Sequence, residues 1–130
     1  MTKIKHGNTI IPYGAHPEEH ERETAKFFNK LGKDVEFLTP SYTKGVASPD
    51  IKMGGIVWEI KAPKGNSSRT IENNLRTALK QSESIIIDLR RIKLDEHKAI
   101  SQIKKLFGIS KKIKRILIIS KEQILLDIKR

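Results

Sequence analysis

The stretch SPDIKMGGIVWEIKAPKG, residues 48–65, decides the fold prediction, because apolar residues alternate with polar ones on both sides of a glycine pair. Alternation of this kind is typical of half-buried strands, and Gly54-Gly55 has the composition of a two-residue hairpin turn. The sequence therefore predicts a β-hairpin with one strand from Asp50 to Met53 and a second from Ile56 to Lys61.

Two carboxylates and an ammonium group on this hairpin point to chemistry. Alternation puts Glu59 and Lys61 on one face of the second strand, and Asp50 opens the first strand opposite Glu59 or one position away. Converging carboxylates form a hard oxygen site that suits Mg²⁺ or Mn²⁺. A lysine beside that site would hold a scissile phosphate, or position or deprotonate the attacking water. A cross-strand ion pair on a solvated face is the structural alternative.

The rest of the chain predicts helices and strands around the hairpin. The first expected elements are a helix with Pro17 in its first turn that ends at Gly32, a strand 35–38 and a helix 69–82 capped by Ser68. A strand 84–89 follows, and its Asp88 could reach a site, although a turn acid at the strand end is favoured. The last expected elements are a helix capped by Asp95 and ended by Gly108, and strands 113–120 and 123–128 joined by a turn at 120–122. Residues 16–130 are therefore expected to form one α/β domain with a mixed central sheet flanked by helices, after a leader or linker of residues 1–15.

The charge of the chain points to a polyanionic partner. The net charge is +11, from 26 Lys and Arg against 15 Asp and Glu. Residues 1–65 hold ten basic against eight acidic side chains, and residues 66–130 hold sixteen against seven. This asymmetry favours nucleic acid first and an anionic membrane surface second, with solubility as the alternative reason. The absence of cysteine excludes disulfides and thiolate metal sites, and no apolar run is long enough to span a membrane.

Pro49-Asp50, followed by Glu59-Ile60-Lys61, resembles the signature of the PD-(D/E)XK nuclease superfamily. The predicted order of elements is similar to the αβββαβ core of that superfamily, with a C-terminal helix and β-hairpin added. The resemblance implies a restriction-endonuclease-like core in which Asp50 and Glu59 bind a divalent metal and Lys61 is the catalytic lysine.

The first predicted helix resembles the corresponding helix of Holliday-junction resolvases, where a glutamate lies eleven residues before a glycine. Counting back from Gly32 identifies Glu21, which the resemblance implies as a third catalytic carboxylate and metal ligand. Glu21 also shares a helix face with Ala25 and Phe28 and is expected to point toward the sheet. Glu23 is the alternative candidate, and a helix-start charge is the structural alternative for both.

Further polar residues extend the candidate site. The superfamily often has a glutamine in its second helix, which implies Gln81 as a catalytic residue. The candidates for binding nucleic acid are Lys64, Ser68, Arg69 and Asn74 near that helix and Lys111, Lys112 and Arg115 in a basic cluster. Loop polarity explains the first group equally well, and lysines that protect an edge strand explain the second.

A longer stretch, from about Glu21 to Arg91, is similar to the C-terminal tRNA-nuclease domain of CdiA-type contact-dependent growth inhibition proteins. The segment from Trp58 to Lys61, followed by Pro63 and Gly65, carries most of this resemblance. It implies a toxin ribonuclease that is part of a larger, secreted or surface-exposed delivery protein. Such a toxin cleaves tRNA in the cytoplasm of a neighbouring bacterium and is neutralised by a cognate immunity protein.

Other functions remain open at this point. A DNase of the same fold, as in resolvases or restriction enzymes, would use the same residues. A non-catalytic nucleic-acid-binding module would explain the charge, but its carboxylates would oppose the approach of phosphate unless a metal neutralised them. Cleavage through the RNA 2′-hydroxyl without metal is a further alternative, and it would leave a 2′,3′-cyclic phosphate.

Overall fold

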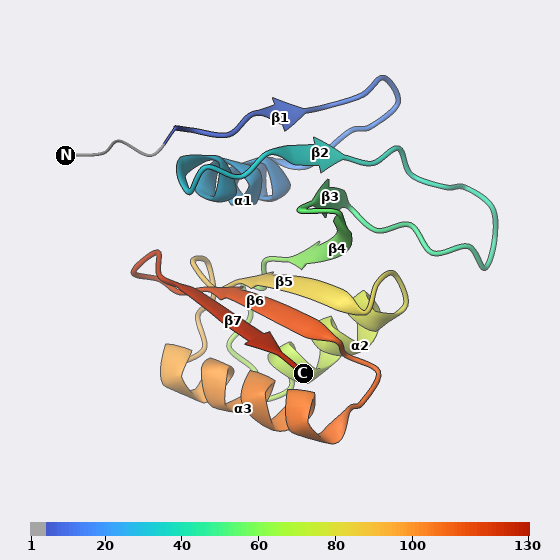
Figure 1. Cartoon of the computed structure of the whole chain (residues 1–130). Helices are drawn as coiled ribbons and strands as arrows, with labels where there is room; N and C mark the ends of the chain where they lie inside the picture. The colour runs from blue at the N-terminus through green and yellow to red at the C-terminus, as the bar shows by residue number, and fades with distance from the viewer. Residues whose placement is uncertain (1–4) are drawn as a thin grey trace.

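The computed structural model of the chain describes residues 5–130, and its helices lie between strands along the sequence (Figure 1). In chain order they are β1 (Thr9–Ile10), α1 (Glu19–Lys30), β2 (Val35–Phe37), β3 (Ile51–Met53), β4 (Ile56–Lys61), α2 (Thr70–Leu79), β5 (Ser84–Asp88), α3 (Glu96–Ile109), β6 (Arg115–Ile119) and β7 (Leu125–Lys129).

The strands form one seven-stranded mixed sheet whose spatial order is the chain order, β1 to β7. β1 is parallel to β2, and β4, β5 and β6 are parallel to one another, whereas β2–β3, β3–β4 and β6–β7 are antiparallel pairs. Helix α1 lies on one face of the sheet, and α2 and α3 lie on the other (Figure 1). The predicted single domain of mixed α/β class is therefore confirmed.

Two apolar cores lie on the two faces of the sheet, and β5 separates them. Ile86 packs with Phe28 and Trp58 on the α1 face, whereas Ile85 packs with Ile71 on the face of the other two helices. Because both faces of β5 are covered, its sequence is an unbroken apolar run rather than an alternating one. Within residues 5–130, no helix is both long enough and apolar enough to cross a membrane.

The predicted hairpin is present, and its turn depends on glycine. Gly54 and Gly55 have φ angles of 60° and 77°, in the left-handed region that side chains with a Cβ rarely adopt. Two successive residues with positive φ form a tight turn whose twist matches that of the antiparallel strands on either side. The turn therefore fixes the register between β3 and β4, and with it the position of every side chain on the hairpin.

Helix α1 begins later than predicted. Its first residue is Glu19, so Pro17 precedes the helix instead of lying in its first turn. The Glu21 carboxylate accepts the N–H of Glu18 at 2.8 Å and thereby satisfies a free backbone donor at the helix start. A capping side chain thus sets this boundary, not the proline.

Two further helix boundaries also differ from the prediction. Ser68 does not cap α2: its N-cap residue is Arg69, which makes no side-chain capping bond, and the Arg69 N–H donates to the Ser67 hydroxyl instead. Helix α3 continues through Gly108 to Ile109, because glycine lowers helix stability without ending a helix by itself.

The ends of the chain add two short corrections to the strands. Residues 1–15 were expected to be a leader or linker, yet Thr9–Ile10 form β1 and pair with β2. The last strand starts at Leu125, two residues later than expected, because Gln123 has a φ of 63° and belongs to the turn.

Candidate active site

The β3–β4 hairpin fixes Asp50 beside Glu59. Ile51 pairs with Trp58, so the next step of the antiparallel register places Asp50 opposite Glu59. The Asp50 side chain here takes the place of a backbone carbonyl in the pairing with β4, because its Oδ2 accepts the N–H of Ile60 at 2.8 Å. The Asp50 N–H donates to the Trp58 carbonyl at 3.0 Å. Backbone and side chain of Asp50 are thus both fixed to β4.

Glu59 is a buried carboxylate, with only 7% of the residue exposed. Its Oε2 lies 3.6 Å from Nζ of Lys61, which is ion-pair range but longer than a good hydrogen bond. Its Oε1 is buried and has no hydrogen-bond partner among residues 5–130. A buried acceptor without a partner is rare in folded proteins, so Glu59 is a candidate ligand or catalytic group.

Helix α1 contributes Glu21 to the same cluster. The Glu21 side chain interacts with that of Asp50, while its Oε1 accepts the Glu18 N–H. Glu23 instead lies on the exposed side of the helix, with its carboxylate 3.4 Å from the Lys26 ammonium. Of the two glutamates considered from the sequence, the structure therefore brings Glu21 to the hairpin and not Glu23.

Proximity and burial make these carboxyl groups hold protons more tightly than usual. Burial raises the pKa of Glu21 from 4.5 to about 7, and the charge of Asp50 adds to the effect. Burial likewise raises the pKa of Asp50 from 3.8 to about 6, with repulsion from Glu59 as a further cause. Burial also raises the pKa of Glu59, although Asp50 and Lys61 partly offset it. Groups with such perturbed pKa values concentrate at functional sites.

The three carboxyl groups form two neighbouring pairs that share Asp50. Within residues 5–130, no three His, Cys, Asp or Glu side chains are grouped closely enough to hold one ion together as they stand. The pair of Asp50 and Glu59 alone offers hard oxygen donors, and Mg²⁺ is commonly bound in proteins through one or two carboxylates. Glu21 adjoins that pair through Asp50.

Gln81 and Asn74 occupy different surroundings. Gln81 Oε1 accepts the N–H of Ser48 at 2.6 Å, so this side chain holds the segment that leads into Asp50. Asn74 Nδ2 donates to the Thr70 carbonyl of its own helix at 2.8 Å. Gln81 is thus placed to position the hairpin, whereas Asn74 has a local helical bond.

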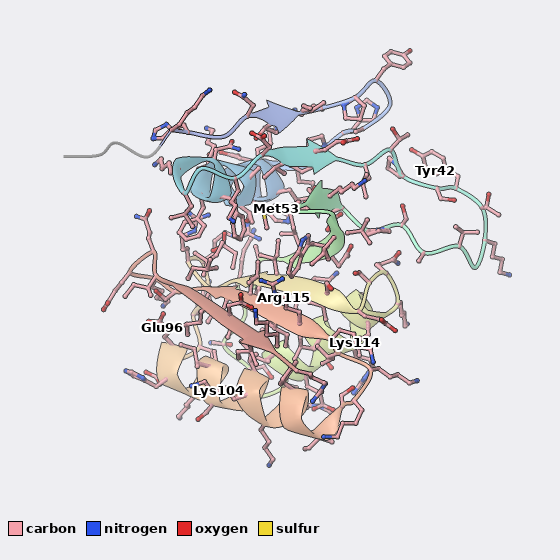
Figure 2. The ribbon with its side chains drawn as sticks, viewed as in Figure 1. Tyr42, Met53, Glu96, Lys104, Lys114 and Arg115 are labelled. Carbon is pink, nitrogen blue, oxygen red and sulfur yellow. The ribbon has the colours of Figure 1, made fainter. Side chains whose placement is uncertain are left out.

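The candidate nucleic-acid-binding residues are mostly exposed. The exposed ones are Lys64, Ser68, Arg69, Lys111 and Lys112. Arg115 differs from these, because it lies on the sheet and forms an ion pair of 2.7 Å with Asp127 (Figure 2). Its guanidinium also lies 5.4 Å from the centre of the Trp58 ring. Arg115 therefore has close structural partners, whereas Arg69 has only a longer contact of 3.8 Å with Glu72.

Sequence reasoning missed a buried polar network next to the site. Asp88 is 4% exposed, accepts a hydrogen bond of 2.8 Å from Thr24 Oγ1 and pairs with Arg90 at 2.7 Å. The Arg90 guanidinium holds the pKa of Asp88 below its usual value, despite the opposing effect of burial. Asp88 is thus a buried ion-pair partner instead of the expected turn acid. Its only sequence signal was its place at the end of an apolar run.

Comparison with known proteins identifies the family. The fold and site define a single mixed α/β domain with clustered carboxylates on a sheet hairpin. A family model described as the contact-dependent growth inhibition CdiA C-terminal domain matches residues 47–125, which is more than half of the chain. The chain therefore belongs to the family of CdiA C-terminal toxin domains, as the sequence had suggested.

A solved structure supports the fold assignment. The chain is similar to one described as "CdiA-CT/CdiI toxin and immunity complex from Burkholderia pseudomallei", with a TM-score of 0.70 and 19% sequence identity. The match covers 95% of this chain and 100% of the other. No curated protein matches the chain.

Proposed function

We propose that this domain is a toxin endoribonuclease of the PD-(D/E)XK type that hydrolyses phosphodiester bonds of tRNA. The observation that carries the proposal is the pair Asp50 and Glu59 next to Lys61, with Glu21 completing the acidic cluster. The order α1-β2-β3-β4-α2-β5 is also the αβββαβ order of that superfamily.

The carboxylates fit a divalent cation, Mg²⁺ or Mn²⁺. All donors of the cluster are oxygens, and the raised pKa values show that three negative charges are costly there without a compensating positive charge. The Glu59 oxygen without a hydrogen-bond partner among the described residues is a further sign. Asp50 and Glu59 would hold the ion, and Glu21, which adjoins Asp50, would join as a ligand only after its side chain moves closer. When bound, such an ion stabilises charge on the phosphate and lowers the pKa of a coordinated water.

The protein side chains supply position and charge. The hydrogen bond from the Ile60 N–H holds the Asp50 carboxylate beside β4. This side chain therefore loses little conformational freedom when the ion or the substrate binds. The Lys61 ammonium carries positive charge next to Glu59 and is placed to stabilise negative charge that develops on a scissile phosphate. Gln81 keeps the segment before Asp50 in place.

Two features favour RNA as the polymer. The stretch from Glu21 to Arg91 resembles tRNA-nuclease toxin domains. Residues 66–130 carry sixteen of the 26 basic side chains against seven acidic ones, which suits binding to the phosphates of a folded RNA. The same family likeness supports delivery into a neighbouring bacterial cell by a larger protein. It also supports a cognate immunity protein as partner, since the similar solved structure is a toxin and immunity complex.

The test is an incubation of the purified protein with total tRNA and, separately, with plasmid DNA, with Mg²⁺ and with EDTA. Glu59→Gln and Lys61→Ala are expected to lower the tRNA cleavage rate by about 100-fold or more. Glu36→Gln and Lys52→Ala are matched controls, because both residues are exposed on neighbouring strands. Product ends decide the chemistry, since a 5′-phosphate fits activated water.

The other outcomes each contradict part of the proposal. A 2′,3′-cyclic phosphate with activity retained in EDTA would replace the metal-dependent mechanism by one through the 2′-hydroxyl. Cleavage of DNA alone would assign the domain as a DNase. Folded protein that cuts neither polymer would leave the carboxylates as a structural ion-pair cluster and the basic surface as a binding surface.

A further inference from the structure

A cavity lies between the start of helix α1 and the ends of strands β4 and β5, and none of the acidic cluster lines it. It has a volume of about 410 Å³, within the range of small-molecule sites. Helix α1 contributes Glu19, His20 and Glu23 to its wall. The rest of the wall lies at the carboxyl ends of two parallel strands, with Ala62 after β4 and with Asp88, Arg90 and Arg91 at the end of β5.

Two residues of the cavity wall are next to candidate catalytic residues in the chain. His20 precedes Glu21 in the chain, and Ala62 follows Lys61, so each cavity residue is one peptide unit, about 3.8 Å between Cα atoms, from a candidate catalytic residue. A nucleic acid whose scissile phosphate lies at Lys61 therefore has a neighbouring nucleotide within reach of this cavity.

The inner wall of the cavity is held rigidly by the buried polar network. Asp88 is bound by Thr24 and by Arg90, and the same guanidinium donates to the Glu23 carbonyl at 3.2 Å. The Arg90 guanidinium also lies 5.5 Å from the centre of the Phe27 ring. Because the charges of Asp88 and Arg90 neutralise each other, this wall defines the shape of the cavity but adds little net charge to it.

The rim of the cavity carries the groups that remain for a ligand. Arg91 donates one N–H to the Ala62 carbonyl at 2.5 Å, and a guanidinium has five N–H donors. Glu19 and Glu23 are exposed carboxylates on the opposite, helical side. The Glu23 carboxylate is paired with the Lys26 ammonium at 3.4 Å, which leaves the Glu19 carboxylate opposite the Arg91 guanidinium. The rim therefore has no excess of positive charge that would favour a phosphate. Its donors and acceptors on opposite sides suit a nucleobase.

We propose that this cavity receives the base of a nucleotide adjacent to the scissile phosphate, and that the base is guanine. Guanine offers O6 and N7 as acceptors to the Arg91 guanidinium, which is the commonest specific contact to this base. Its N1–H and N2–H₂ groups are donors, which match the carboxylate of Glu19 on the opposite wall. Enzymes that do chemistry on a nucleic-acid base likewise hold the extruded base in a pocket and read its edge by hydrogen bonds. This inference rests on the proposed nuclease function and deepens it.

The test is a titration of the isotope-labelled protein with the four nucleoside 5′-monophosphates, with guanosine and with inorganic phosphate, followed by amide NMR shifts. Guanosine and its monophosphate are expected to shift the amides of His20, Ala62 and Arg91, with about ten-fold tighter binding than the adenine nucleotide. Equal binding of all four nucleotides, or the same shifts with phosphate alone, would overturn the proposal.

Variants separate the base contact from folding. Arg91→Ala and Arg91→Lys are both expected to lose the preference for guanine by about ten-fold, because lysine lacks the planar two-donor geometry. Arg91 is exposed, and although Arg91→Ala removes its hydrogen bond to the Ala62 carbonyl, Arg91→Lys keeps a donor for that carbonyl. Arg22→Ala, an exposed arginine of α1 outside the cavity, is expected to change nothing. Loss of guanine preference in that control would overturn the assignment.

A cleavage readout distinguishes this inference from the proposed function. Sequencing of tRNA fragments is expected to find guanine enriched beside the cut by the wild type, and no enrichment with Arg91→Ala. Cleavage without any base preference in the wild type would refute the base pocket while leaving the nuclease intact. Absence of cleavage, together with guanosine binding at the cavity, would refute the nuclease while leaving the base site.

Discussion

The acidic cluster predicts an unusual dependence of stability on pH, which Asp50→Asn tests directly. A carboxyl group with a raised pKa binds its proton more tightly in the folded state than in the unfolded state. Its contribution to stability is therefore complete below its pKa in the unfolded chain, and it is lost as pH rises through its pKa in the folded protein. For Asp50 this interval runs from 3.8 to about 6. The wild type is therefore expected to lose stability between about pH 4 and pH 7 because of this group.

The magnitude follows from the same two values. A pKa of about 6 against an ordinary 3.8 corresponds to about 3 kcal/mol, and solvent screening of this half-buried side chain reduces it to roughly 1–2 kcal/mol. Asparagine retains an acceptor for the Ile60 N–H and carries no charge. Asp50→Asn is therefore expected to be more stable than the wild type at pH 8, by that amount, and equally stable at pH 4.

The assay is urea unfolding of both proteins at a series of pH values. Asp127→Asn is the control of opposite sign, because the Arg115 guanidinium lowers the pKa of Asp127. This control is expected to be less stable than the wild type at pH 7, with the difference disappearing as pH falls through the lowered pKa of Asp127. An Asp50→Asn protein less stable than the wild type at pH 8 would refute the reasoning, since it would make the ionised carboxylate a net stabilising group.

Three further predictions address other parts of the molecule. Gln81→Ala is expected to lower kcat while costing only about 1 kcal/mol of stability, measured by urea unfolding; an unchanged kcat would show that the hairpin needs no such support. Asp88→Ala leaves Arg90 without its buried partner and is expected to cost about 3–5 kcal/mol, visible as a lower unfolding midpoint; a change under about 1 kcal/mol would contradict the buried network. Replacing Lys111 and Lys112 together is expected to reduce the slope of log affinity for tRNA against log salt concentration by about two, and an unchanged slope would remove both from the RNA surface.

The hairpin could be predicted from sequence because its determinants are local. Alternating apolar residues and a glycine pair specify strands and turn, and the pleat then places Glu59 and Lys61 on one face. Glu21 could also be predicted, because the resemblance to resolvase helices identified it and helical spacing placed it on the buried face of α1. Local pattern was enough for the hairpin because its contacts lie across one tight turn, whereas the contact of Glu21 with Asp50 depends on how α1 packs against the sheet.

Contacts between distant parts of the chain could not be predicted in this way. Thr24 and Asp88 are 64 residues apart, and only the packing of α1 against the end of β5 brings them together. Arg115 looked like part of a basic surface because its partner, Asp127, comes from the antiparallel neighbour strand. Charges that look solvated in the sequence become paired when a sheet register sets them opposite each other.

The order of the strands has a consequence for how the chain reaches its fold. Each strand from β1 to β7 lies beside its neighbours in sequence, so no strand has to insert between two that are already paired. The antiparallel pairs β3–β4 and β6–β7 close short loops and lose little chain entropy, whereas the parallel pairs β4–β5 and β5–β6 close longer connections that contain a helix. Each further strand can then add at an edge of the sheet. For a domain whose proposed role takes it into another cell, this topology would allow activity to return soon after transfer, even if the chain arrives unfolded.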